Sequence, residues 1–213
     1  MADTTDTTAM TPTPVLPTPA HTIGPFYGYA LPFPGGADVA PAGHPDTITV
    51  HGRVLDGAGA PVPDALLEFW GPGPDGEPPC ATGSLRRDPV TGGFLGRDGI
   101  RFTGFGRVPT DADGHWALRT LRPGARGRGA PYLSVCVFAR GLTRHLFTRV
   151  YLPVFLPEEP GEGGDDGAAT DPLLASLAPE RRATLLAMGE PAGSYRFDIR
   201  LQGAAETVFL EFL

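Results

Sequence analysis

The chain has 213 residues, of which 41% are hydrophobic, 30 are glycine and 25 are proline, and its formal net charge is −7. So much Gly and Pro without a collagen-like period indicates many turns between short strands, so we expect a mainly β protein. The acidic balance argues against nucleic-acid binding, and the lack of an apolar run of about 20 residues argues against a membrane span.

The N-terminal residues 1–20 form a Thr/Pro/Ala-rich tail that we expect to be disordered or extended, ahead of a single domain over 21–213. Within the domain, residues 23–33 place aromatic rings among Gly and Pro, where we expect no regular element. We therefore predict an extended N-terminal arm whose rings dock on the rest of the protein or on a partner.

Seven runs with strand-like alternation follow, separated by turn residues such as Asp56-Gly-Ala-Gly and Asp111-Ala-Asp-Gly. They are 48–55, 65–70, 115–121, 131–140, 145–153, 194–201 and 207–212. This number of short strands predicts an antiparallel β-sandwich of prealbumin-like type.

One helical segment interrupts the strand pattern. Asp171 fits a helix N-cap followed by Pro172 in the first turn, and Pro179 can open a second turn, so one helix or two short helices are expected. The acidic, glycine-rich residues 158–171 before it are expected to form a flexible surface loop.

The run 131–140, PYLSVCVFAR, carries the argument about chemistry. Alternation places Tyr132, Ser134, Cys136, Phe138 and Arg140 on one face of a strand. Cys136 is expected to be a buried apolar residue, and two cysteines in the whole chain suggest neither a disulfide framework nor a Cys-rich zinc site, which suits a cytoplasmic protein.

The five histidines lie at 21, 44, 51, 115 and 145 without any spacing typical of metal ligands, so no metal site is predicted on this chain. The sequence also has no Gly-x-Ser-x-Gly elbow, no Walker loop and no dinucleotide fingerprint.

Over residues 11–213 the chain resembles the intradiol ring-cleavage dioxygenases, and among them the metal-free subunit of the heteromeric members. The matching segments, in order, are TPAHTIGPFYGYALP, HGRVLDGAGAPVPDALLEFW, FTGFGRVPTDADGHWALRTLRPG, APYLSVCVFARG, DPLLASLAPERRATLLA and YRFDIRLQGAAETVFLEF.

The resemblance implies a ferric ion held by two Tyr and two His in a catalytic chain, but all four ligand positions differ here. The His-x-His pair is replaced by Tyr132 and Ser134, one tyrosine position is nearest to Pro78, and the other falls in the short loop 125–130. We therefore expect Fe(III) on a β subunit with which this chain forms an αβ hetero-oligomer.

The resemblance also implies which residues of this chain help to build the shared site. Substrate binding is expected from Thr22, Gly24, Pro25 and Phe26 of the arm, and a catalytic contribution from Arg140, which competes with a role as an interface ion pair. The implied reaction is cleavage of a small aromatic substrate, protocatechuate, by O2 to 3-carboxy-cis,cis-muconate.

Two alternatives remain open from the sequence. The first is a β-sandwich binding or structural module without a catalytic partner, which predicts a stable homo-oligomer. The second is a self-sufficient dioxygenase that takes replacement ligands from His21, Tyr27, Tyr29 and Tyr132, which predicts iron in the purified chain.

Overall fold

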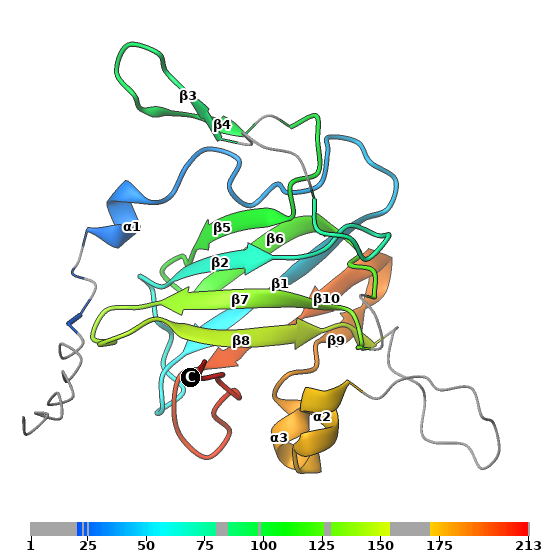
Figure 1. Ribbon diagram of the computed structural model, residues 1–213. Helices are drawn as coiled ribbons and strands as arrows, with labels where there is room; N and C mark the ends of the chain where they lie inside the picture. The colour runs from blue at the N-terminus through cyan, green and yellow to red at the C-terminus, as the bar shows by residue number, and fades with distance from the viewer. Residues whose placement is uncertain are drawn as a thin grey trace, which may run out of the picture.

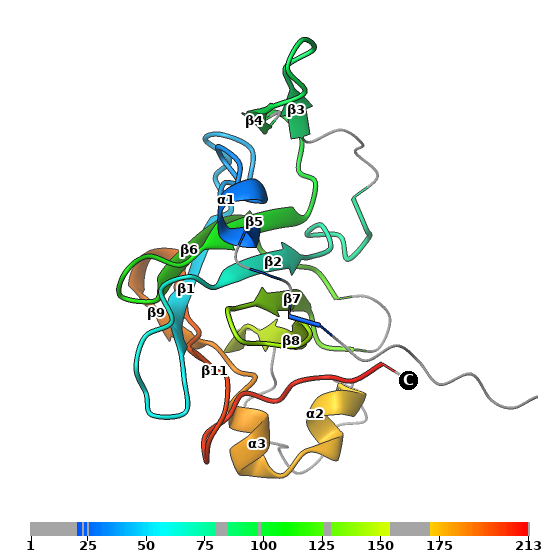
Figure 2. The same ribbon diagram turned by 90° about the vertical axis from the view of Figure 1, so that its left-hand side faces the viewer.

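Two β-sheets pack face to face and enclose the main apolar core (Figures 1 and 2). This computed structural model describes residues 21–212 except 23, 25, 80–84, 98, 126–128 and 154–170. The first sheet contains β1 (Thr47–Leu55), β6 (His115–Leu121), β9 (Met188–Glu190), β10 (Ser194–Arg196) and β11 (Ile199–Arg200). The second has the order β5 (Phe105–Pro109), β2 (Leu66–Trp70), β7 (Tyr132–Phe138) and β8 (Leu146–Tyr151).

Shorter elements decorate these two layers. The hairpin of β3 (Leu85–Arg87) and β4 (Phe94–Arg97) projects from the sandwich, as Figure 2 shows. The helices are α1 (Tyr27–Ala30), α2 (Pro172–Ser176) and α3 (Pro179–Ala183), and the 3-10 turn η2 (Pro191–Gly193) precedes β10. Within the described part of the chain, no helix is long and apolar enough to cross a membrane.

The core forms because each central strand turns its apolar side chains to one face. In β7 the buried residues Leu133, Val135 and Val137 alternate with half-buried neighbours, except that Cys136 is buried as well. Phe69 from β2 meets Trp116 from β6 with ring centroids 5.0 Å apart, which joins the two sheets. The predicted β-sandwich and the alternation of residues 131–140 are therefore confirmed.

The predicted strand 194–201 is wrong in two respects, because it divides into β10 and β11 and both pair with β1 in parallel. The break follows from a close approach of the chain to Gly52, where a Cβ atom would lie 1.8 Å from the carbonyl oxygen of Phe197. The half-exposed Asp198 side chain then accepts a hydrogen bond from the Arg53 backbone N–H at 2.9 Å. Antiparallel pairing is thus the wrong expectation for the contact of this segment with β1, whereas β10 pairs antiparallel with β9 and β1 pairs antiparallel with β6.

Other differences arise at the ends of the chain. The arm contains the one-turn helix α1 where no regular element was expected, because Ala30 and Leu31 donate backbone hydrogen bonds to Phe26 and Tyr27. Residues 207–212 form no strand and make a single bridge between Leu210 and Phe147. The strands β3, β4, β5 and β9 were not predicted.

The two short helices confirm the expected Asp171-Pro172 and Pro179 starts. The Asp171 side chain accepts hydrogen bonds from the backbone N–H groups of Leu173 and Leu174, which is N-cap geometry. Leu174 of α2 and Leu185, which follows α3, pack with Tyr151 and Val208 in a second, smaller apolar cluster. The predicted tail 1–20 and loop residues 158–170 lie outside the described residues, and the single-domain boundary stays a prediction.

Candidate functional site

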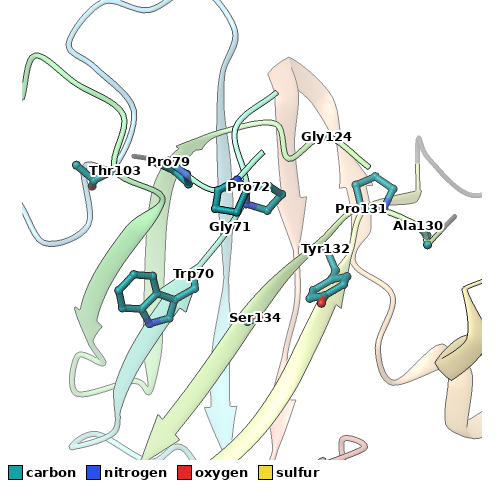
Figure 3. Close-up of a pocket in the computed structure, with 12 residues that line it drawn as sticks. Trp70, Gly71, Pro72, Pro79, Thr103, Gly124, Ala130, Pro131, Tyr132 and Ser134 are labelled. Carbon is teal, nitrogen blue, oxygen red and sulfur yellow. The ribbon is translucent and has the colours of Figure 1, made fainter. Parts of the chain in front are cut away.

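A cavity of about 370 Å³ opens where β2 ends and β7 begins (Figure 3). Its walls are rich in proline and aromatic side chains, and none of the lining residues is charged. They are Trp70, Gly71, Pro72, Pro78, Pro79, Thr103, Gly124, Gly129, Ala130, Pro131, Tyr132 and Ser134. The cavity therefore gathers Pro78, Tyr132 and Ser134, which stand at positions where the resemblance led us to look for metal ligands.

These residues do not fit a ferric ion. Among the lining residues, Tyr132 alone offers a phenol oxygen, and there is no histidine or carboxylate. The Arg149 guanidinium carbon lies 4.0 Å from the centroid of the Tyr132 ring, so a positive charge already stands beside this phenol. Across the residues that the structure describes, no group of three or more His, Cys, Asp or Glu side chains is arranged to hold a metal.

The guanidinium of Arg149 belongs to a half-buried network that ties β8 to α2. Arg149 donates to the Tyr151 hydroxyl at 3.1 Å, and this hydroxyl donates to the Asp171 carboxylate at 3.0 Å. The Asp171 side chain is 3% exposed and also lies 3.9 Å from Arg149. A buried carboxylate held by a phenol, a guanidinium and two backbone N–H groups fixes the position of the charge beside the cavity.

Alkaline pH is expected to destabilise this network. Burial raises the pKa of Tyr151 from 10.0 to about 12, so between these values the unfolded chain loses a proton that the folded chain keeps. The free energy of unfolding should fall by about 2 to 3 kcal/mol over that window through Tyr151 alone, and the contribution is complete below pH 10. Urea unfolding at pH 8 to 12 measures the slope, which should become flatter in Tyr151→Phe.

The buried thiol of Cys136 titrates in the same range, since burial raises its pKa to about 12. The comparison therefore uses Cys136→Ala as the background for both chains. If the unfolding free energy fell equally with and without the Tyr151 hydroxyl, the loss of stability at alkaline pH would not come from Tyr151.

A second cluster lies around Asp64, where the arm meets the turn after β7. The Tyr27 hydroxyl donates to the Asp64 backbone carbonyl, and Arg140 Nε lies 2.7 Å from the Asp64 carboxylate. Burial raises the pKa of Tyr27, with the nearby Asp64 charge adding to the effect, so this phenol stays neutral as an anchor. Arm and arginine are thus brought to one place, although they are far apart in the sequence.

The predicted arm residues stand beside this anchor. Phe26, next to Tyr27, is 76% exposed, Thr22 is exposed, and Gly24 adopts a positive φ of 75°. The Gly24 N–H donates to Thr22 Oγ1 at 3.4 Å, and Pro25 lies outside the described residues.

The C-terminal end of the arm, at Leu31 and Phe33, is also bound to the rest of the chain. Arg107 donates to the Leu31 carbonyl at 2.8 Å while it pairs with Glu68 of β2. Phe33 is buried beside Phe105, with ring centroids 6.5 Å apart. The rings of Tyr27 and Phe33 are therefore covered by this chain, whereas those of Phe26 and Tyr29 are left to solvent or a partner.

The cavity and the arm cluster occupy opposite ends of the second sheet. In Figure 1, α1 and the β7–β8 turn lie on one side, and the start of β7, which carries Tyr132, lies on the other. Arg140, which follows the C-terminal end of β7, therefore lies away from the vacant ligand positions at the start of that strand. The same arrangement also separates Tyr27 from Tyr132, so these two of the four candidate ligands of a self-sufficient iron site do not lie close together.

Sequence reasoning missed Asp64, the shared partner of Tyr27 and Arg140, and the Arg149–Tyr151–Asp171 network. Asp171 was expected only as a helix cap. The side-by-side placement of Arg149 and Tyr151 on one strand face, opposite Ser134 and Tyr132 in the neighbouring strand, was the available signal.

The chain is similar in sequence to both chains of one enzyme. It is 36% identical over 215 residues to the protocatechuate 3,4-dioxygenase alpha chain of Burkholderia cepacia, which covers 91% of this chain and 96% of that one. Against the beta chain from the same organism the identity is 29% over 171 residues, with 76% and 67% covered. No family model matches the sequence.

A solved structure of similar fold is the dioxygenase domain of a dioxygenase carbohydrate-binding protein fusion from Streptomyces sp. SirexAA-E. It has a TM-score of 0.52 and 26% identity, and the match covers 88% of this chain and 99% of that domain.

Proposed function

Because the chain belongs to the intradiol ring-cleavage dioxygenase family, as a homologue of protocatechuate 3,4-dioxygenase alpha chains, we propose that it is the metal-free alpha subunit of such an enzyme. In this role it completes the substrate pocket of an Fe(III)-bearing beta subunit, which cleaves protocatechuate with O2 to 3-carboxy-cis,cis-muconate. The proposal includes a cytoplasmic location and a single domain over residues 21–213.

The observation that carries the proposal is the difference between the two ends of the second sheet. At the cavity, the donor set does not fit ferric iron, which members of this family use. At the opposite end, an anchored arm and Arg140 present exposed side chains, Phe26 and the Arg140 guanidinium among them. Exposed binding groups of this kind are expected where a second chain supplies the remaining walls of a pocket.

The residues of this chain would act by binding and orienting the substrate. Arg140 uses Nε for Asp64 and keeps its outer face exposed, so its guanidinium is free to pair with a carboxylate of the substrate. Phe26 offers a flat apolar surface to an aromatic ring, and Gly24 lets the backbone approach closely. Closing the pocket with this arm would exclude water from the ring that reacts, while the bound iron supplies the activation of the catechol.

The test is to express this chain alone and together with a beta-chain homologue from the same source, and to measure iron content and protocatechuate-dependent O2 uptake. We expect no iron and no turnover in the single chain, and both in the copurified complex. Iron and turnover in the single chain would overturn the proposal, and so would a homo-oligomer that does not bind the beta chain.

Gly24 tests the role of the arm. Alanine at this position has to adopt φ near 75°, which costs about 1 to 2 kcal/mol, although its Cβ would meet no described atom within 4 Å. We therefore expect Gly24→Ala to raise KM for protocatechuate about 5- to 10-fold in the complex. Gly28→Ala is the matched control, because that glycine lies in α1 with open space around it and no positive φ. Equal KM values for the two variants would contradict a pocket-lining arm.

A further inference from the structure

The cavity between β2 and β7 has no part in the proposed function, and its chemistry is specific. We infer that it is a second, non-catalytic binding site on this chain for a monocyclic phenolic acid. The inference rests on this cavity alone and does not depend on the proposed subunit role.

Size and wall chemistry select a planar ring. A volume of about 370 Å³ lies at the small end of the range for ligand pockets, enough for one ring with short substituents. In Figure 3 Trp70 and Tyr132 stand on either side of Ser134, with proline rings above them. Trp70 packs on Phe105 at 4.5 Å between centroids yet stays 54% exposed, so it offers a flat surface that this chain leaves uncovered.

Two hydroxyl groups select a hydrogen-bonding substituent. Tyr132 and Ser134 both line the cavity, and neither hydroxyl has a hydrogen-bond partner among the described residues. Thr103, by contrast, has its hydroxyl engaged by Arg97 at 2.8 Å. A phenol group on the ligand can both donate to and accept from these two hydroxyls.

Arg149 selects an anion. Its guanidinium lies over the Tyr132 ring and opposite Ser134 in the strand register, while no acidic side chain lines the cavity. Of its donors, Nη1 contacts Tyr151 and Asp171, and Nε and Nη2 have no partner in the part of the chain that is described. The Asp171 carboxylate caps α2 and pairs with Nη1, and it also approaches the cavity wall at Gly129, where a Cβ atom would lie 3.1 Å from its Oδ2. Arg149 is not itself a lining residue, so its Nε and Nη2 donors serve a ligand carboxylate from beside Tyr132 and Ser134, which do line the cavity.

Binding of 4-hydroxybenzoate to the full-length chain tests the inference. Equilibrium dialysis should give one saturable site per chain with a Kd near or below about 1 mM, which is a reasonable affinity for so small a ligand. Tryptophan fluorescence should change on binding, since Trp70 lines the cavity while Trp116, the other tryptophan, is buried in the core. Neutral 4-hydroxybenzyl alcohol and non-planar cyclohexanecarboxylate should each bind at least about 5-fold more weakly, because one lacks the charge and the other lacks the flat ring.

Variants locate the site. Ser134→Leu and Ala130→Leu fill the cavity from two directions and should each weaken binding at least about 10-fold, whereas the exposed control Ala205→Leu should leave it unchanged. Arg149→Gln should abolish the preference for the acid over the alcohol, and Arg149→Lys should retain part of it. If one of the two cavity-filling variants does not fold, the other still tests whether the ligand binds in this cavity.

The inference is overturned if 4-hydroxybenzoate does not bind saturably, if both filling variants bind as the parent chain does, or if the alcohol binds as tightly as the acid. None of these results requires turnover, iron or a second chain. They are therefore separate from any failure of the proposed subunit role.

Discussion

Replacing Arg140 by alanine is expected to lower kcat/KM for protocatechuate about 100-fold in the complex with the beta chain, with little change in stability. Arg140 is 73% exposed, and its ion pair with Asp64 is a surface contact of the kind that contributes about 0 to 1 kcal/mol. In a pocket closed by a second chain, the same guanidinium would make a charge-assisted hydrogen bond to an anionic substrate. Such a bond is worth about 2 to 3 kcal/mol, which corresponds to the expected factor.

The substrate and a matched arginine separate this role from a purely structural one. Catechol, which lacks the carboxylate, should react with the Arg140→Ala complex with less than about a 5-fold loss, because the missing charge has nothing to pair with. Arg144→Ala is the control, since Arg144 is 69% exposed and pairs with Glu211 at 3.7 Å in a similar surface contact. Equal losses for the two substrates, or a loss of complex formation instead of kcat/KM, would show that Arg140 is an interface residue.

The strands with a clear alternation of apolar and polar residues were predictable, because the residues of the strand itself determine which of its faces is buried. The prediction of 115–121 matches β6, and 131–140 contains β7 with its buried and half-buried residues in alternation. The division of 194–201 could not be read locally, because it depends on the approach of Phe197 to Gly52, far away in the sequence. The short helix α1 was likewise missed, since its Gly and aromatic residues have weak helix propensity and Tyr27 is held by its contact with Asp64.

The candidate site divides in the same way. The vacancy at Tyr132 and Ser134 was visible without a fold, because the family resemblance implies a His-x-His pair at these two positions, which lie on one face of β7. The contacts of Asp64 and the position of Arg149 over Tyr132 depend on which loops and strands become neighbours. Sequence reasoning named Arg140 through a resemblance, but its anchoring to the arm through Asp64 needed the three-dimensional structure.

Removing the carboxylate in Asp171→Ala is expected to lower the free energy of unfolding by about 3 to 5 kcal/mol. This side chain is 3% exposed and holds the Tyr151 hydroxyl, the Arg149 guanidinium and two backbone N–H groups of α2. Its loss leaves a half-buried positive charge and a buried hydroxyl without their acceptor, and it removes the N-cap of the helix. Urea unfolding of the full-length chain at pH 7.5, which is below the range where Tyr151 titrates, measures the difference.

Asp171→Asn divides this loss into its two sources. An asparagine oxygen can still cap α2 and accept from Tyr151, but it carries no charge for Arg149, so its cost should fall between those of the parent chain and Asp171→Ala. Asp113→Ala, an exposed turn residue, serves as the control and should change the unfolding free energy by less than about 0.5 kcal/mol. If Asp171→Ala were as mild as this control, the network beside the cavity would not hold Arg149 in place. Any preference of the cavity for an anion would then depend on an Arg149 guanidinium that Asp171 does not hold beside Tyr132.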